Sequence, residues 1–141
     1  MKLHHLLFLL LFASNSFAQN QTSSDELVID NRLYDIFDEE YLENLKDNNP
    51  FMIQRWNYYL DHAWYLSDYP SEKGNPDYPT IQINNLDQIN IFQIEKEQLT
   101  KRDWNKQMMY QIEGTNKILV YHSGKKFVNL LNEHLGRTVR K

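Results

Sequence analysis

The stretch that decides the fold is Met108-Met109-Tyr110-Gln111-Ile112-Glu113-Gly114-Thr115-Asn116-Lys117-Ile118-Leu119-Val120-Tyr121. In its first part, the apolar residues Met108, Tyr110 and Ile112 alternate with polar ones, which is the pattern of a strand with one buried face. Residues 113–116 contain a glycine and an asparagine, and they are typical of a turn. Residues 117–121 are apolar on both faces, so we expect this returning strand to be central in its sheet.

A helix is predicted to follow the returning strand. Ser123 suits its N-cap and Gly136 suits the left-handed position after its last turn. Its apolar positions are Phe127, Leu130, Leu131 and Leu135. Upstream of the hairpin, residues 70–79 are rich in proline and indicate a loop. Residues 80–83 and 89–95 are predicted to be further strands, the second of them apolar on both faces.

Two helices are predicted nearer the N-terminus. Residues 38–46 have an acidic first turn, and Pro50 suits the first position of the second helix. The apolar spacing supports a helix that ends near His62, with residues 63–69 as an aromatic strand. Residues 27–29 are either a short strand or the first ordered contact. The predicted fold class is α+β, with two N-terminal helices, a small mostly antiparallel sheet and a C-terminal helix packed on it.

The N-terminus reads as a secretory signal peptide over residues 1–18. A charged start, the apolar run 6–12 and the small-x-small end Ser16-Phe17-Ala18 follow one another at the usual spacing. The apolar run is too short to span a bilayer. We expect cleavage after Ala18, a flexible lead-in over 19–26 and a single domain over 27–141. Gln19 stands where a lipoprotein would have cysteine, so the expected product is a periplasmic protein without a lipid anchor, or alternatively a secreted one.

The composition narrows the function classes. The chain has 15 Lys+Arg against 19 Asp+Glu, a formal net charge of −4, which makes it a poor candidate for binding nucleic acid. It has no cysteine, so disulfide bonds cannot stabilise it. Residues 25–47 are mainly acidic and the last third is mainly basic. Either these two parts attract each other within the fold, or the basic end docks on an acidic partner.

The sequence contains no catalytic or metal-binding motif from which a site could be predicted. His62, His122 and His134 lack the close spacing of zinc ligands, and no nucleophile elbow occurs. The carboxylate pairs Glu39/Glu40 and Glu95/Glu97 could serve a glycosidase only if the fold set them at a working separation across a cleft. We therefore expect no catalytic residue, no metal ligand and no cofactor, and we keep a small cell-wall hydrolase as an alternative.

One segment is unusually aromatic and is the candidate interaction surface. Its residues are Arg55, Trp56, Tyr58, Tyr59, Trp64, Tyr65 and Tyr69. Some of these rings must belong to the core. A single helix could not bury all of them on one face, and exposed Tyr, Trp and Arg are the residues that build interface hot spots. They also stack on sugar rings, so a secreted carbohydrate- or peptide-binding module is a second possibility.

Residues 49–59 (NPFMIQRWNYY) and 112–124 (IEGTNKILVYHSG) give the chain a resemblance to a family of small exported proteins of bacteria with a type IX secretion system. The resemblance covers most of the chain after the signal peptide. It implies a non-catalytic periplasmic interaction protein, namely an accessory or plug subunit that seals the outer-membrane secretion translocon. The expected partner is then an outer-membrane or periplasmic protein.

Overall fold

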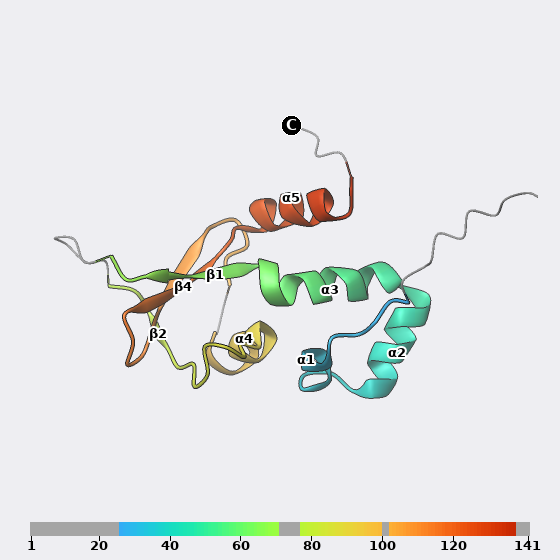
Figure 1. Ribbon diagram of the computed structural model, residues 1–141, viewed down its shortest axis with the longest axis horizontal. Helices are drawn as coiled ribbons and strands as arrows, with labels where there is room; N and C mark the ends of the chain where they lie inside the picture. Colours follow the sequence, from blue (N-terminus) through green and yellow to red (C-terminus); the bar gives the residue numbers. More distant parts are fainter. Residues whose placement is uncertain (1–25, 71–76, 100–101, 138–141) are drawn as a thin grey trace, which may run out of the picture.

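The computed structural model describes residues 26–70, 77–99 and 102–137. This part of the chain has a mixed α+β fold with five helices and four strands (Figure 1). In chain order they are α1 (Asn31–Tyr34), α2 (Glu39–Asn48), α3 (Pro50–His62), β1 (Trp64–Asp68), β2 (Thr80–Ile81), α4 (Ile91–Gln98), β3 (Met108–Ile112), β4 (Lys117–Tyr121) and α5 (Gly124–His134). The expected signal peptide, nearly all of the lead-in and the middle of the 70–79 loop lie outside the described residues.

The sheet is built on the predicted hairpin. The strand order is β1-β4-β3-β2, and β4 pairs antiparallel with both β1 and β3. This confirms β4 as an inner strand, and its residues Leu119 and Tyr121 are fully buried. The short strand β2 pairs in parallel with β3, so the sheet is mostly but not wholly antiparallel. Gly114 forms the hairpin turn with a φ of 73°, a backbone conformation that glycine adopts without strain.

The boundary between α3 and β1 falls where the sequence predicts it. The helix ends at His62, and Ala63 closes it with helical backbone angles. The carbonyl oxygen of Ala63 then accepts a hydrogen bond of 2.9 Å from the backbone N–H of His122. One buried alanine therefore ends the helix and begins the pairing with β4. The predicted helix over 38–46 is also confirmed, as α2.

The prediction of a strand over residues 89–95 is wrong, because residues 91–95 lie in α4 and Asn90 is its N-cap. The side chain of Asn90 caps the helix by accepting a hydrogen bond from the N–H of Gln93. Ile91 and Ile94 are three positions apart, so they fall on one buried helical face. The apolar run was read as a strand buried on both faces, and the capping asparagine was the signal that favours a helix.

The N-terminal part decides between the two alternatives for residues 27–29 and adds a helix that was not predicted. Residues 27–29 form no strand, and Ile29 instead supplies the first buried contact. The additional helix α1 follows at once, and the side chain of Asp30 caps it. Its apolar residue Leu33 is completely buried. A helix of four residues has too few periodic positions to be predicted from the sequence.

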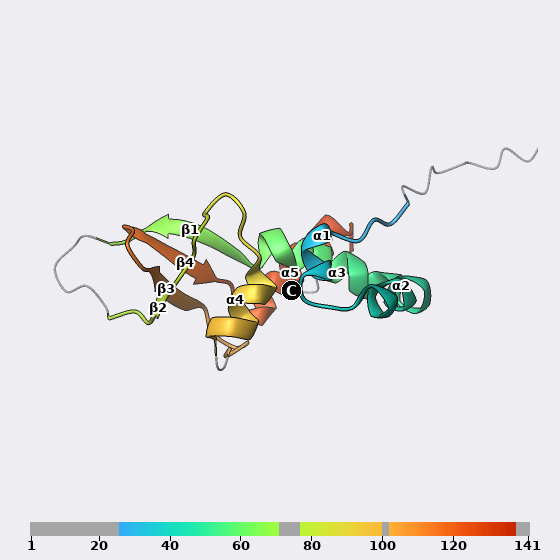
Figure 2. The same cartoon turned by 90° about the horizontal axis from the view of Figure 1, so that it is seen from below.

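The C-terminal helix α5 begins after the Ser123 cap, as predicted, and Gly136 follows it with a φ of 64°. It lies beside α3 rather than flat on the sheet, which corrects the expected packing (Figures 1 and 2). Phe127 and Leu131 nevertheless enter the same core cluster as residues of β4. The sheet forms one end of the elongated molecule, the helices α1, α2, α3 and α5 form the other, and α4 lies where the two parts meet (Figure 2).

Candidate functional site

In the structure the aromatic segment consists of a helical half, residues 55–59 of α3, and a strand half, residues 64–69, which are β1 and the residue after it. In the helical half, Tyr59 is a core residue with 4% of its surface exposed. Trp56 is half-buried and stacks on Phe37 with ring centroids 4.7 Å apart. Arg55 is half-buried on the same helix, and no ion pair is found for it among the described residues. Two of these residues are therefore packing residues of the helical end.

Tyr58 lies on the opposite side of α3, between α3 and α5. Its ring stacks on His62 with centroids 4.0 Å apart, and on His134 of α5 with centroids 4.5 Å apart. Its hydroxyl donates to the carbonyl oxygen of Leu130 at 3.3 Å. Burial raises the pKa of the Tyr58 hydroxyl, and the nearby Glu133 carboxylate adds to this shift. These contacts join the two helices, so Tyr58 is chiefly an interhelical residue.

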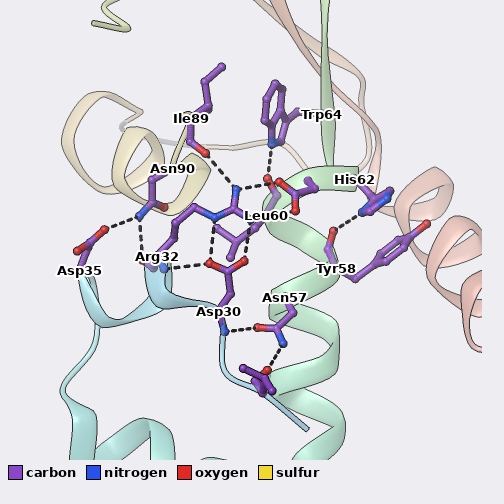
Figure 3. Close-up of polar contacts among 12 residues, drawn as sticks. Asp30, Arg32, Asp35, Asn57, Tyr58, Leu60, His62, Trp64, Ile89 and Asn90 are labelled. Carbon is purple, nitrogen blue, oxygen red and sulfur yellow. Dashed lines mark hydrogen bonds and ion pairs between the residues drawn. The ribbon is translucent and has the colours of Figure 1, made fainter. Parts of the chain in front are cut away.

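The strand half of the segment occupies β1 and the residue that follows it. Trp64 is half-buried and donates from its indole Nε1 to the carbonyl oxygen of Leu60 at 2.7 Å (Figure 3). Tyr65 is 43% exposed and lies beside His122. Tyr69 packs edge-on against Tyr78. The strand half therefore brings an exposed and two half-buried rings to the end of the molecule that the sheet forms.

The strand β1 is an edge strand, and its hydrogen-bond register shows which groups face outward. Ala63 and Tyr69 make backbone hydrogen bonds with the residues opposite them, through His122 N–H to Ala63 O and Tyr69 N–H to Asn116 O. Because bonded and non-bonded pairs alternate in an antiparallel ladder, Tyr65 and Ser67 also face β4. The N–H and C=O groups that point away from β4 are therefore those of Trp64, Leu66 and Asp68. These three residues define what we call the β1 edge.

No backbone partner for the β1 edge is found among the described residues. The side chains of Trp64 and Leu66 share the sheet face of their cross-strand partners Tyr121 and Leu119, which are fully buried. Tyr65 lies on the opposite face. At the end of the strand, Asp68 forms an ion pair with Lys117 of β4. The pairing with β4 and the Asp68–Lys117 ion pair thus hold β1 in place, while the outward main-chain groups of the β1 edge remain available for hydrogen bonds.

A polar network beside Trp64 holds the N-terminal segment to α3 (Figure 3). Arg32 donates two hydrogen bonds to the carboxylate of Asp61, at 2.8 and 2.9 Å, and two to that of Asp30. Its fifth donor reaches the carbonyl oxygen of Ile89 at 3.4 Å. Asn57 of α3 accepts from the N–H of Asp30 at 3.0 Å. The Arg32 guanidinium lowers the pKa of the Asp30 carboxyl, mainly through their hydrogen bond.

Two shallow hollows adjoin this network. One has a volume of about 490 Å³ and extends from Arg32, Asp61 and Trp64 to the loop before α4. The other has a volume of about 360 Å³ and lies between the same loop and the exposed side of α4. They share the residues Gln88, Ile89, Asn90 and Gln93, so the two hollows are adjacent. A third hollow, of about 350 Å³, lies beside Tyr58 and its two histidines.

Of the four carboxylates weighed for catalysis, Glu97 lines one of these hollows, whereas Glu39, Glu40 and Glu95 line none of them. Glu95 faces the core, where its carboxylate accepts hydrogen bonds from the Tyr59 hydroxyl and from Arg102. Glu97 is exposed on the same helix. Burial raises the pKa of the Glu95 carboxyl to about 7, and the Tyr121 hydroxyl opposes this shift. Glu39 and Glu40 are both exposed in the first turn of α2.

Arg102 is the most enclosed charged side chain near Glu95, with 8% of its side chain exposed. Its guanidinium lies over the rings of Trp104 and Tyr121, 4.1 and 4.6 Å from their centroids. It also donates to the carbonyl oxygen of His122 at 2.9 Å. Burial lowers the pKa of Arg102, and the neighbouring tyrosines oppose this shift. These contacts join α4, β4 and the loop before β3, which is a structural role.

The three histidines within the described residues lie apart from any group suited to a metal. His62 and His134 flank Tyr58, whereas His122 lies at the end of β4, where burial lowers its pKa. In the described ranges no three His, Cys, Asp or Glu side chains gather as metal ligands. Likewise, no helix there is long and apolar enough to cross a membrane.

Sequence reasoning missed two features of this region. The first is the outward main chain of β1, which no described residue pairs. It depends on the order of the strands in the sheet, and no local sequence pattern predicts that order. The hollows along α4 were missed because residues 89–95 were read as a strand, although the amide-rich run 82–98 was visible. No known protein family, curated protein or solved structure matches this chain.

Proposed function

We propose that this chain is a non-catalytic interaction protein of the cell envelope, and that it binds an extended segment of a partner protein at the β1 edge. The observation that carries the proposal is the outward main chain of Trp64, Leu66 and Asp68, which has no partner in the described part of the chain. An extended peptide can add to such an edge as a further strand, with main-chain hydrogen bonds providing affinity.

The side chains around the β1 edge support this mode of binding. Natural proteins protect exposed edges with Lys, Pro or inward-pointing charges. Between Trp64 and Asp68 the strand has none of these in its centre, and the charge of Asp68 is already paired with Lys117. Tyr65 adds an exposed ring beside the edge, of the kind found in interface hot spots. Side chains of an added strand would contact Tyr65 on one face and Leu66 on the other.

The location of the partner follows from the expected signal peptide, which directs the chain to the periplasm. The resemblance to small exported proteins of type IX secretion bacteria makes an outer-membrane translocon protein the first partner to test. In that setting the chain would act as an accessory or plug subunit that helps to seal the translocon. Strand addition suits this role, because it attaches a small domain to one segment of a larger complex.

A matched pair of substitutions tests the β1 edge. Asp68→Pro removes an outward N–H without removing a hydrogen bond to β4, whereas Asp68→Ala removes the same ion pair but keeps the N–H. Both variants and the wild type would carry an affinity tag and be used to capture proteins from native outer membranes. We expect Asp68→Ala to capture the partner and Asp68→Pro to lose most of it. Circular dichroism would establish that both variants are folded.

Tyr65→Lys provides a second variant, because it places a charge beside the edge without changing the main chain. Reduced capture by both Tyr65→Lys and Asp68→Pro would support strand addition. Equal capture by all folded variants would refute it. Light scattering of the purified protein tests whether a second copy of the chain occupies the β1 edge. A wild-type dimer that is absent in Asp68→Pro would show that the edge pairs with that second copy instead.

A further inference from the structure

A groove lined by amide side chains runs along α4 and the loop that precedes it. It consists of the two adjacent hollows, of about 360 and 490 Å³, that are both lined by Gln88, Ile89, Asn90 and Gln93. Further amides line it from the loop and from the far end of the helix: Gln82, Asn84, Asn85 and Gln98. We call this combined surface the amide groove. It adjoins the outward main chain of β1 at Trp64, which is the residue that the two surfaces share.

Part of the amide groove is held rigid by internal hydrogen bonds. The side chain of Gln98 accepts from the N–H of Gln82 and donates to its carbonyl oxygen, both at 2.7 Å. Asn90 is fixed at the centre, because it donates to the carbonyl oxygen of Arg32 at 2.8 Å (Figure 3) and accepts from the N–H of Gln93. The loop and the helix therefore form a fixed wall rather than a set of mobile side chains.

Other amides of the groove are available to a ligand. Asn84 and Gln88 are exposed, and within the described residues no hydrogen bond is found for their side-chain amides. Each can donate two hydrogen bonds and accept two. Apolar surface lies beside them, supplied by Ile83 and by the pair Leu86 and Trp64. The groove thus offers uncharged donors and acceptors next to apolar surface.

The charges of the groove argue against an anionic ligand. Arg32 is the one cation that lines it, and its five donors are all engaged by Asp30, Asp61 and Ile89. Exposed carboxylates at Asp35, Asp87 and Glu97 line the same surface. A phosphate or sulfate would therefore meet repulsion without a free cation to offset it.

We propose that the amide groove binds a neutral oligosaccharide. Sugar hydroxyls donate and accept hydrogen bonds in pairs, which matches the donors and acceptors of Asn84 and Gln88, and the apolar face of a sugar ring suits Leu86 and Trp64. The open, elongated form of the groove fits a linear chain of sugar units. This site would let the protein bind a polysaccharide of the cell envelope in addition to a protein partner at the β1 edge.

Isothermal titration calorimetry with two probes, chitohexaose and cellohexaose, tests the proposal on the purified protein. We expect at least one of them to bind. Asn84→Ala and Gln88→Ala should each weaken binding about fivefold, the effect of one lost hydrogen bond, and the double variant about 25-fold. Gln107→Ala is the matched control, since Gln107 is an exposed amide outside the groove, and its affinity should equal that of the wild type.

Three results would overturn the proposal: no binding of either probe at millimolar concentration, equal binding by the wild type and the double variant, or binding of a lysine-rich peptide in place of the sugars. Asp68→Pro separates this proposal from the strand-addition proposal. It should leave sugar binding unchanged, because Asp68 does not line the groove. Loss of sugar binding in that variant, with the fold intact, would also contradict a separate site.

Discussion

The guanidinium of Arg32 and the carboxylate of Asp61 form two parallel hydrogen bonds, 2.8 and 2.9 Å long, that attach α1 to the last turn of α3. The two residues are 29 positions apart in the chain. The pair is partly exposed, with 29% of the Arg32 side chain and 53% of the Asp61 side chain accessible. The pair therefore stabilises the fold through its two parallel hydrogen bonds and through the contact of Arg32 with Asp30, rather than through charge alone.

Arg32→Lys tests this geometry, because lysine keeps the charge but cannot make two parallel hydrogen bonds to one carboxylate. We expect the free energy of unfolding to fall by about 1–2 kcal/mol. Urea denaturation measures the change. Arg55→Lys is the control, and its stability should stay within about 0.5 kcal/mol of the wild type. Equal stability of both variants would show that the Arg32 network contributes only charge.

The pH dependence of stability should reveal Glu95. Burial raises the pKa of this carboxyl from 4.5 to about 7, so the folded state holds its proton more tightly than the unfolded state. Its contribution to stability is therefore complete below pH 4.5 and is lost as the pH rises through about 7. Comparing Glu95→Gln with the wild type in urea between pH 4.5 and 8 isolates this contribution, which should amount to about 3 kcal/mol.

Glu97→Gln provides the control for Glu95, because Glu97 is exposed two positions further along the same helix. Its stability should follow the wild type at every pH. If the difference between wild type and Glu95→Gln does not change with pH, then the pKa of Glu95 is not raised. A nuclear magnetic resonance titration of the Glu95 side-chain carboxyl would give the same answer directly, with a midpoint near 7 expected.

Trp56→Ala should separate packing from partner binding. The indole stacks on Phe37 and meets Phe92 edge-on, so its loss should lower the free energy of unfolding by about 2–3 kcal/mol. Trp56 lies outside the β1 edge, so the folded variant should still capture the partner. Val128→Ala, at an exposed apolar residue of α5, should change stability by less than about 0.5 kcal/mol. Loss of capture by folded Trp56→Ala would move the interaction surface to the helical half.

Two glycines should respond to alanine through different mechanisms. At Gly114 an added Cβ would meet nothing within 4 Å, so the cost of about 1 kcal/mol would come from its φ of 73° alone. At Gly124 an added Cβ would lie 3.0 Å from the ring and from the carbonyl oxygen of Trp104. We expect Gly124→Ala to change the tryptophan fluorescence of the folded protein, and Gly114→Ala to leave it unchanged.

Local patterns were sufficient for much of the fold. Alternation and a glycine turn predicted the β3–β4 hairpin, proline at the first position predicted the start of α3, and Ser123 and Gly136 predicted both ends of α5. The prediction failed for α4, where an apolar run fits a buried strand and a short helix equally well. Asn90 decided in favour of the helix, because its side chain caps the first turn and also anchors to Arg32.

The sequence by itself determined the α+β class and the central position of β4, because the apolar patterns that indicate them extend over only a few neighbouring residues. Its composition also determined that aromatic and amide side chains are abundant. Only the tertiary structure decided what those side chains can do. Strand order left β1 at the edge of the sheet, and the packing of α4 beside its loop placed Asn84 and Gln88 on one surface. Both outcomes depend on contacts between distant segments, which no local pattern specifies.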